Sequence, residues 1–433
     1  MLLGTLGFKT LPGLYTGQPL SWLDALFTAT SAVCVTGLIV VDTATYFTPA
    51  GQAYVLLLIQ LGGLGILTFT TLIILAFGRR LSLHHEAVTA TAIDIAPEVD
   101  FRKLLRDVLL FTLLLEAAGA VILFLTWLPR FPPGEAAWHA LFHAVSAFCN
   151  AGFSTFSDSL LGFQRSPVSL LVLMVLIVLG GLGFLTLEEL HLRGRSGKQP
   201  FRLSLQTRLV LAVSGILLAG GWLMYVLLEW ENALGELPGW GRLLNALFMS
   251  VNARTAGFNS VDYGHAADSS NFITILLMSI GGSPGSTAGG LKTTTVAVIG
   301  LLALARLRGY HVTSVGSRTI PEETVQRAVG LFVVAFVVVM AGILILAVTE
   351  IQPMGRSTPG SFFRYMFEAV SAFNTVGLSL GVAPELSPFG KTVTAALMYL
   401  GRVGPLTFAT AIALARPRLG GEFRYAHEDV IIG

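Results

Sequence analysis

A short segment that runs from a serine to a glycine occurs four times along the chain, and this repeat constrains the fold more than any other feature. The copies are SAVCVTG over 31–37, SAFCNAG over 146–152, SVNARTAG over 250–257 and SAFNTVG over 371–377. Each copy ends an amphipathic stretch that is too short to cross the hydrocarbon of a membrane. These stretches lie near 21–33, 136–148, 240–252 and 361–373. Repetition in one register predicts a molecule built from equivalent units.

A second glycine-rich element follows each first glycine after about 24 to 28 residues. It occupies 62–65, 180–183, 281–285 and 401–405. The repeating unit is therefore a helix, a half-helix, a glycine loop and a second helix. We place the four units at 1–78, 79–193, 194–308 and 309–415, with a tail over 416–433.

Composition identifies the solvent of these units as lipid. Hydrophobic residues make up 54% of the 433 residues and charged residues only 12%, whereas soluble domains carry about 25% charged residues. We predict an all-α membrane protein with eight transmembrane helices, two in each unit. The spanning candidates lie near 53–77, 104–128, 168–190, 209–230, 272–305, 329–350 and 391–415.

The first helix is the exception among the spans, because it is about 13 residues shorter than its three counterparts. We expect either a start upstream of Met1 or an abbreviated first span.

Basic residues indicate the orientation of the spans. Most of the 27 lysines and arginines lie in the linkers 78–106, 191–208 and 305–327 and in the tail, and the positive-inside rule places such segments in the cytoplasm. We therefore expect a multi-pass protein of the bacterial inner membrane, surrounded by lipid, with a cytoplasmic C-terminus. The net charge of +2 gives no reason to expect a nucleic acid as partner.

The direction of the repeats predicts a pore. Each unit crosses the membrane twice, so all four point the same way and can surround an axis along the membrane normal. Transporters built from inverted repeats have units of opposite direction, which disfavours that architecture here.

The glycine loops have the chemistry of a cation filter. A glycine allows the dihedral angles that turn successive carbonyls to one side, and rings of carbonyls replace the hydration shell of K⁺ in filters that read TVGYG. We predict K⁺ at this filter and no other metal. The expected ligand segments are Val35, Thr36 and Gly37; Asn150, Ala151 and Gly152; Thr255, Ala256 and Gly257; and Thr375, Val376 and Gly377. Three acids beyond these loops, Asp42, Asp158 and Asp262, would attract cations to an outer mouth.

The segment 281–292 must interrupt the second helix of the third unit. It carries five glycines and one proline within ten residues, and both residue types disfavour a helix. Its register places the break on the cytoplasmic side of the filter. Lys292 at its end and Arg402 in the fourth unit are cations at membrane depth, which usually face a cavity or a partner. We expect Arg402 to lie near this loop and to raise the barrier to permeation.

The four filter segments in order resemble those of the Trk/Ktr/HKT superfamily of potassium transporters, over essentially the whole chain. The KtrB group, the membrane subunits of bacterial Ktr systems, is most similar. The resemblance implies K⁺ uptake without enzymatic activity, a homodimer with one pore per protomer, and a cytosolic ring of KtrA-type regulatory subunits. A nucleotide is expected on that partner, and no cofactor in this chain. Dependence on Na⁺ stays open.

The resemblance also assigns the interrupted helix as an intramembrane gate. It assigns the segment 281–292, and the residues of this segment that we expect in the gate are Gly281, Gly282, Ser283, Gly285, Ser286, Thr287, Gly289, Gly290 and Lys292. Arg402 joins them on our own hypothesis. In plant relatives a serine at the first filter glycine accompanies Na⁺ selectivity, so Gly37 favours K⁺. A Na⁺-permeable pore is the alternative within this class.

Other chemistries fit the sequence less well. Ser283 lies in a formal G-x-S-x-G pattern, but a nucleophile elbow needs a strand before it. His139 and His143 share one face of a half-helix without a third metal ligand.

Glu368 is expected to hold a filter-supporting group, and the side chain of Arg254 to point away from the pore. Glu116 is a second carboxylate at membrane depth, where a functional role is the default.

Overall fold

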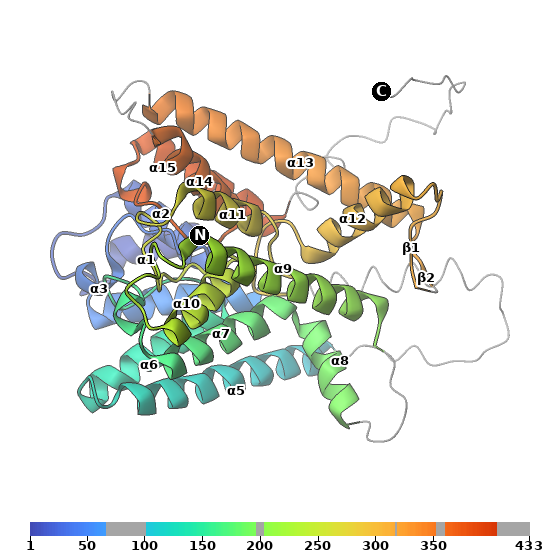
Figure 1. The fold of residues 1–433 in the computed structure, drawn as a ribbon. Coiled ribbons are helices and arrows are strands. Elements are labelled where there is room, and N and C mark those ends of the chain that lie inside the picture. The colour runs from blue at the N-terminus through green and yellow to red at the C-terminus, as the bar shows by residue number, and fades with distance from the viewer. Residues whose placement is uncertain (66–100, 196–202, 317, 352–359, 405–433) are drawn as a thin grey trace.

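The computed structural model describes residues 1–65, 101–195, 203–316, 318–351 and 360–404, which are almost wholly helical (Figure 1). The first two units hold α1 (Leu2–Thr10), α2 (Trp22–Cys34), α3 (Thr43–Tyr46), a helix over 49–65, α5 (Phe101–Trp127), α6 (Pro133–Phe148), η2 (Leu161–Phe163), α7 (Pro167–Leu182) and α8 (Phe184–Arg195). The last two hold α9 (Leu205–Glu229), α10 (Gly239–Asn252), α11 (Asp268–Met278), α12 (Thr293–Leu307), α13 (Glu322–Leu346), η3 (Ala347–Ile351), α14 (Ser361–Phe373), η4 (Ala383–Glu385) and α15 (Pro388–Val403).

A single two-stranded hairpin joins α12 to α13 within the described ranges. Strands β1 (Ser314–Val315) and β2 (Arg318–Thr319) pair antiparallel, with Ser314 opposite Thr319.

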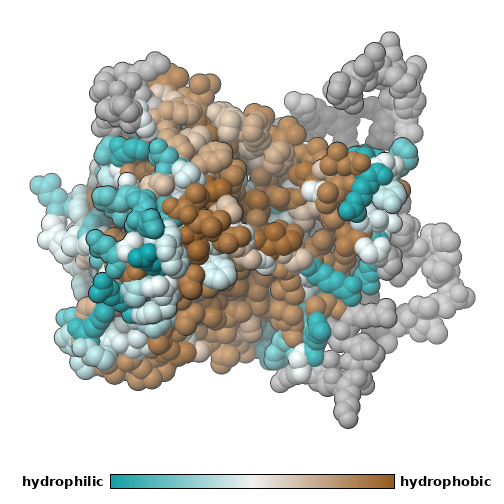
Figure 2. All heavy atoms as spheres, viewed as in Figure 1, coloured by the Kyte–Doolittle hydropathy of each residue, from teal (hydrophilic) through white to brown (hydrophobic). Residues whose placement is uncertain are grey.

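Three described helices are long and apolar enough to cross a membrane, and the bent pair α7 and α8 makes a fourth candidate. The three are the outer helices α5, α9 and α13 (Figure 1). Less than a third of the most apolar window of each is buried inside the protein. Figure 2 shows the consequence: on the face in view, an apolar band covers the middle of the molecule, and hydrophilic residues gather at its two ends. This is the surface of a multi-pass membrane protein.

The four predicted half-helices are confirmed as α2, α6, α10 and α14. They begin and end within a few residues of the expected positions. Local chemistry explains their starts: Ser21 caps α2 by accepting from Asp24 N at 3.0 Å, and Pro133 opens α6, where a missing N–H costs no helical bond. All four are buried at their C-terminal halves. The chain therefore has the predicted repeated architecture, with each half-helix directed into the interior.

The second helices of the units depart from the prediction in one place. The break in the third unit is confirmed, since α11 ends at Met278 and α12 begins at Thr293. However, the predicted span over 168–190 is a bent pair of helices rather than one straight helix. The chain bends by 104° between α7 and α8 at Gly183, whose φ of +87° no ordinary helical residue adopts. The parts of the predicted spans over 66–77 and 405–415 lie outside the described residues.

Polar contacts at one end of the molecule fasten the first helix of a unit to the second. In the second unit Trp127 Nε1 donates to Ser169 Oγ at 2.9 Å. In the third, Glu229 accepts from Ala267 N at 2.9 Å, and in the fourth Glu350 accepts from Ser387 N at 2.8 Å. Both carboxylates are fully buried. The sequence alone did not identify these two carboxylates as contacts. Each lies at the end of an apolar helix, where a charged residue is expected to mark the end of a membrane span.

Candidate functional site: a ring of carbonyls and the loop beneath it

The four glycine loops share an unusual backbone conformation. The residue two positions before each filter glycine has a positive φ although it is not glycine, with values of 51° to 68°. Such a conformation costs roughly 1–2 kcal/mol for an L-residue, and strain of this kind collects at functional sites. The four residues are Val35, Asn150, Thr255 and Thr375. The filter glycines themselves have φ between 68° and 93°. The predicted repeat is thus a repeat of backbone geometry.

The four loops close into a ring. A Cβ built on each glycine would meet the carbonyl oxygen of the residue that precedes the glycine of the next unit, and the fourth unit leads back to the first. The pairs are Gly37 with Ala151 O, Gly152 with Ala256 O at 2.8 Å, Gly257 with Val376 O at 2.5 Å, and Gly377 with Thr36 O. Four backbone carbonyls therefore surround one axis, and any side chain at these glycines would enter the space between them.

Each half-helix fixes its own loop through polar groups near its C-terminus. Ser31 Oγ accepts from Gly37 N, and Ser371 Oγ accepts from Gly377 N, both at 3.1 Å. In the third unit Asn252 Oδ1 takes this role toward Phe258 N at 2.9 Å. The helix C-termini also direct their partial negative charge toward the ring, which favours a cation there.

The second glycine element lets the second helices approach the half-helices closely. A Cβ at Gly62, Gly180 or Gly401 would collide with the carbonyl oxygen four residues before the filter glycine of the same unit. Those carbonyls belong to Val33, Phe148 and Phe373. In the third unit the matching Gly281 instead packs on Gly289 O of its own loop. The nearly constant number of residues between the two glycine elements therefore places the second glycine against the end of its own half-helix.

The loop between α11 and α12 is held beneath the ring by Thr287. The N–H of Thr287 donates to Gly180 O at 3.2 Å, and its hydroxyl donates to Phe148 O, at the end of the second half-helix, at 3.2 Å. Its carbonyl oxygen accepts from Arg402 Nη1. Thr287 is 1% exposed, so these bonds form away from water.

Arg402 connects the loop to the first unit as well. Its Nη2 donates to Gly62 O at 3.0 Å, and the residue is 7% exposed. Gly290 N donates to Gly401 O at 3.2 Å, and Lys292 Nζ donates back to Ala288 O at 2.6 Å. A Cβ at Gly289 would collide with Thr375 Oγ1 of the fourth filter loop. The loop thus touches all three neighbouring units, directly or through Arg402.

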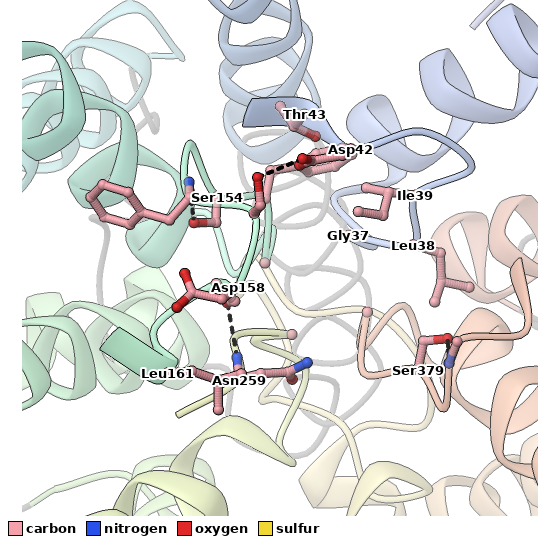
Figure 3. A pocket seen from close by; sticks show the side chains of 18 of the residues that line it. Gly37, Leu38, Ile39, Asp42, Thr43, Ser154, Asp158, Leu161, Asn259 and Ser379 are labelled. Atoms are coloured by element: carbon pink, nitrogen blue, oxygen red, sulfur yellow. Dashed lines mark hydrogen bonds between the residues drawn. The ribbon is translucent and has the colours of Figure 1, made fainter. Parts of the chain in front are cut away.

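One side of the ring, which the sequence predicts to face outward, opens into a cavity of about 350 Å³, viewed from close by in Figure 3. The lining residues come from all four units and include the four filter glycines together with Asp42, Asp158 and Asp262. Asp42 Oδ2 accepts from Ser157 Oγ at 2.6 Å, which joins the first unit to the second (Figure 3). The three predicted mouth residues therefore share one vestibule with the ring.

The remaining charges near the ring have neutral partners. Glu368 Oε2 accepts from Ser379 Oγ at 2.7 Å, just beyond the fourth filter loop. Glu116 accepts from Gln60 Nε2 at 3.0 Å and lies against the Cys149 thiol. Arg254 Nη2 reaches Ser214 Oγ of α9 at 3.2 Å, so its side chain points away from the axis.

The residues considered for other chemistry have structural contacts. Ser283 Oγ accepts from Thr293 Oγ1 at 3.2 Å. His143 Nδ1 faces the backbone oxygen of His139, and its Nε2 pairs with Ser154 Oγ at 2.9 Å. The part of the chain that the structure describes has no group of three His, Cys, Asp or Glu side chains placed to hold a metal ion.

Comparison with known proteins agrees with the membrane architecture. Ktr system potassium uptake protein B from Vibrio alginolyticus is 38% identical over 100% of this chain and 92% of its own length. Potassium/sodium uptake protein NtpJ from Enterococcus hirae is 37% identical over 96% of this chain and 91% of its own.

The crystal structure of the potassium transporter TrkH from Vibrio parahaemolyticus superposes with a TM-score of 0.72 at 21% identity. The match covers 92% of this chain and 79% of that one, and it supports the fold. The family model described as TrkH, cation transport protein, matches residues 6–419. The chain therefore belongs to the TrkH family of cation transport proteins and is a transporter rather than an enzyme.

Proposed function

We propose that this chain takes up K⁺ across the bacterial inner membrane through the ring of filter carbonyls. The closed ring, in which each glycine faces a carbonyl of the next unit, carries the proposal. Four carbonyls around one axis can replace part of the hydration shell of a cation. The names of the two relatives, both potassium uptake proteins, support the choice of ion.

The loop over 281–292 is the gate in this proposal. The proposal places the loop between the filter and the cytoplasm. The bonds of Thr287 and Arg402, which hold the loop against neighbouring units, support it. Permeation requires that the loop move aside. We further propose a homodimer and a cytosolic nucleotide-binding ring of the KtrA type as the regulator, with the hairpin region 318–327 as one contact. The tail 416–433, the other expected contact, lies outside the described residues.

Uptake of K⁺ by purified protein tests the proposal directly. The full chain is reconstituted in liposomes with K⁺ inside and a trace of ⁸⁶Rb⁺ outside, and Na⁺ competition is measured in parallel. We expect ⁸⁶Rb⁺ accumulation that external K⁺ abolishes and Na⁺ reduces weakly. Equal competition by Na⁺ would favour the second candidate, a Na⁺-permeable pore, which the name of the Enterococcus relative supports. Accumulation equal to that of empty liposomes would overturn the proposal.

Growth provides an independent test in cells. A bacterium without its own K⁺ uptake systems, given this chain and a regulatory ring, is expected to grow at low external K⁺. The matched control carries Gly257→Asp, which places a carboxylate side chain where a Cβ would already lie against Val376 O. Growth that does not differ between the two strains would count against the filter.

A further inference from the structure

The bend between α7 and α8 is complementary to the loop proposed as the gate. In a continuous helix, Gly180 O would accept from Phe184 N, and Gly181 O from the N–H of residue 185. The break at Gly183 leaves these carbonyl and N–H groups without helical partners, and they form hydrogen bonds with the loop instead. Thr287 N donates to Gly180 O at 3.2 Å, Ser283 N donates to Gly181 O at 3.0 Å, and Phe184 N donates to Gly285 O at 3.0 Å.

The two bonding patterns exclude each other. The N–H of Phe184 donates either to Gly285 O of the loop or, in a straight helix, to Gly180 O, because one N–H serves one acceptor. A straight helix would also place the N–H of residue 185 on Gly181 O, where Ser283 N now donates. A buried polar group without a partner is costly, so an intermediate with neither set of bonds is disfavoured. The pair α7 and α8 therefore has two arrangements: bent and bonded to the loop, or straight and released from it.

The residue at position 183 determines which of the two arrangements is more stable. Its φ of +87° is open to glycine but strained for other residues, and an added Cβ would lie 2.6 Å from Pro284 O. The bent state thus requires glycine at this position for two separate reasons. The straight state does not, since an alanine favours a continuous helix.

The far end of this element lies at the end of the molecule that the positive-inside rule assigns to the cytoplasm. Glu189 of α8 accepts from Ser204 Oγ at 2.8 Å and also from Ser204 N and Thr207 Oγ1, and so caps the start of α9. On its other flank, a cavity of about 660 Å³ separates α8 from α5. Figure 1 shows α8 turned across the direction of α7 at the end of the molecule opposite α3. Movement of α8 relative to α9 would therefore change the hydrogen bonds between the bend and the loop.

We propose that Gly183 is a positioning residue for the gate, and that straightening of α7 and α8 releases the loop from beneath the filter. This inference rests on the proposed function, because it takes the loop over 281–292 to be the gate. According to this inference, a conformational change on the cytoplasmic side acts on the gate through α7 and α8 of the second unit.

Spin labels on the full-length protein test the bend without any measurement of transport. Leu171 in α7 and Leu192 in α8 are 47% and 49% exposed and accept labels after mutation to cysteine, whereas Cys34 and Cys149 are buried. With a rise of 1.5 Å per residue and a bend of 104°, the distance between the labelled sites is roughly 20 Å when bent and roughly 30 Å when straight.

Two variants are expected to act in opposite directions. Gly183→Ala shifts the distance toward the longer value and raises ⁸⁶Rb⁺ uptake in liposomes by about tenfold, because the bent state alone is penalised. Leu185→Pro is tolerated in the first turn of α8 but breaks a straight helix, so it keeps the short distance and suppresses the effect of Gly183→Ala in the double variant. Gly194→Ala, in the same helix with open space around it, leaves both readouts at the wild-type value.

Three outcomes would overturn the inference: a short distance in Gly183→Ala, raised uptake without the longer distance, or raised uptake that persists in the double variant. A wild-type protein that takes up no ⁸⁶Rb⁺ would overturn the proposed function instead. The distance measurement would still decide whether the bend at Gly183 is a two-state element.

Discussion

At the scale of single residues, the site depends on positions where a side chain cannot fit. The four filter glycines face carbonyl oxygens across the ring, and the residues two before them are held in left-handed backbone. Neighbouring serines and an asparagine fix this backbone from behind. Selectivity in this proposal therefore comes from backbone geometry, and the side chains around it maintain that geometry.

Gly37→Ser is expected to reduce K⁺ uptake strongly and to lower the preference for K⁺ over Na⁺. The added Cβ would collide with Ala151 O, and the φ of 93° is strained for serine. A penalty of 1–2 kcal/mol corresponds to about a tenfold loss of the conducting conformation. Competition of Na⁺ with ⁸⁶Rb⁺ uptake measures the change. Gly17→Ser, at a glycine with open space around it, is the control. Unchanged selectivity in Gly37→Ser would contradict the role of the ring.

Arg402→Ala is expected to raise basal K⁺ uptake. Arg402 is the donor to Thr287 O and Gly62 O, so its loss frees the loop from two units. Bonds from a charged donor contribute about 1.5–3 kcal/mol, which allows an increase of tenfold or more. Arg165→Ala, which removes an exposed arginine from the molecular surface, is the control. Basal uptake equal to that of the wild type would show that Arg402 does not hold the gate.

At the scale of elements, three units share one contact between the second helix and the half-helix, and the third unit differs. Glycines at the second element bring three of the second helices against the half-helices. In the third unit the helix is interrupted, and the resulting loop bonds to carbonyl groups near the ends of α7 and α15. Gly401 O is available to the loop, because residue 405, which would donate to it in a helix, is a proline without an N–H.

Gly401→Ala is expected to destabilise the folded protein. The methyl group would overlap Phe373 O, at the end of α14, and overpacking of this kind costs roughly 1–3 kcal/mol. The midpoint of thermal unfolding in detergent, followed by tryptophan fluorescence, measures the effect. Gly300→Ala in α12 is the matched control, since nothing lies within 4 Å of its Cβ position and alanine is the better helix former. Equal midpoints for the two variants would refute the packing role of Gly401.

At the scale of the whole molecule, three acids from different units lie beside the ring, and in the proposed function cations meet them before the filter. Asp42, Asp158 and Asp262 come from three units and line the outer cavity together with the filter glycines. The summed field of three carboxylates raises the local concentration of cations in such a cavity.

Replacement of all three acids by asparagine is expected to raise the KM for K⁺ by a few fold at low ionic strength and to leave the maximal rate unchanged. The difference should disappear at about 1 M salt, where the Debye length falls to about 3 Å. A matched triple variant removes the same charge outside the cavity, at Glu135, Glu231 and Glu236. An equal rise of KM in both variants would assign the effect to net charge rather than to the vestibule.

Much of this molecule follows from the sequence alone. The apolar composition determined the solvent, and the repeated segments determined the units, the half-helices and the break before Thr293, because glycine, proline and hydrophobic length act through local backbone chemistry. Contacts between units were not readable in this way. The bend at Gly183 looked like part of an unbroken apolar span, and the hydrogen bonds that hold it come from the loop of another unit.

The partners of Glu229, Glu350 and Arg402 were likewise decided by the tertiary structure. Each of these side chains binds a backbone group in a different helix. A sequence shows which groups need a partner at membrane depth. The fold decides which groups meet, because hydrogen bonds between distant segments depend on how the four units close around the axis.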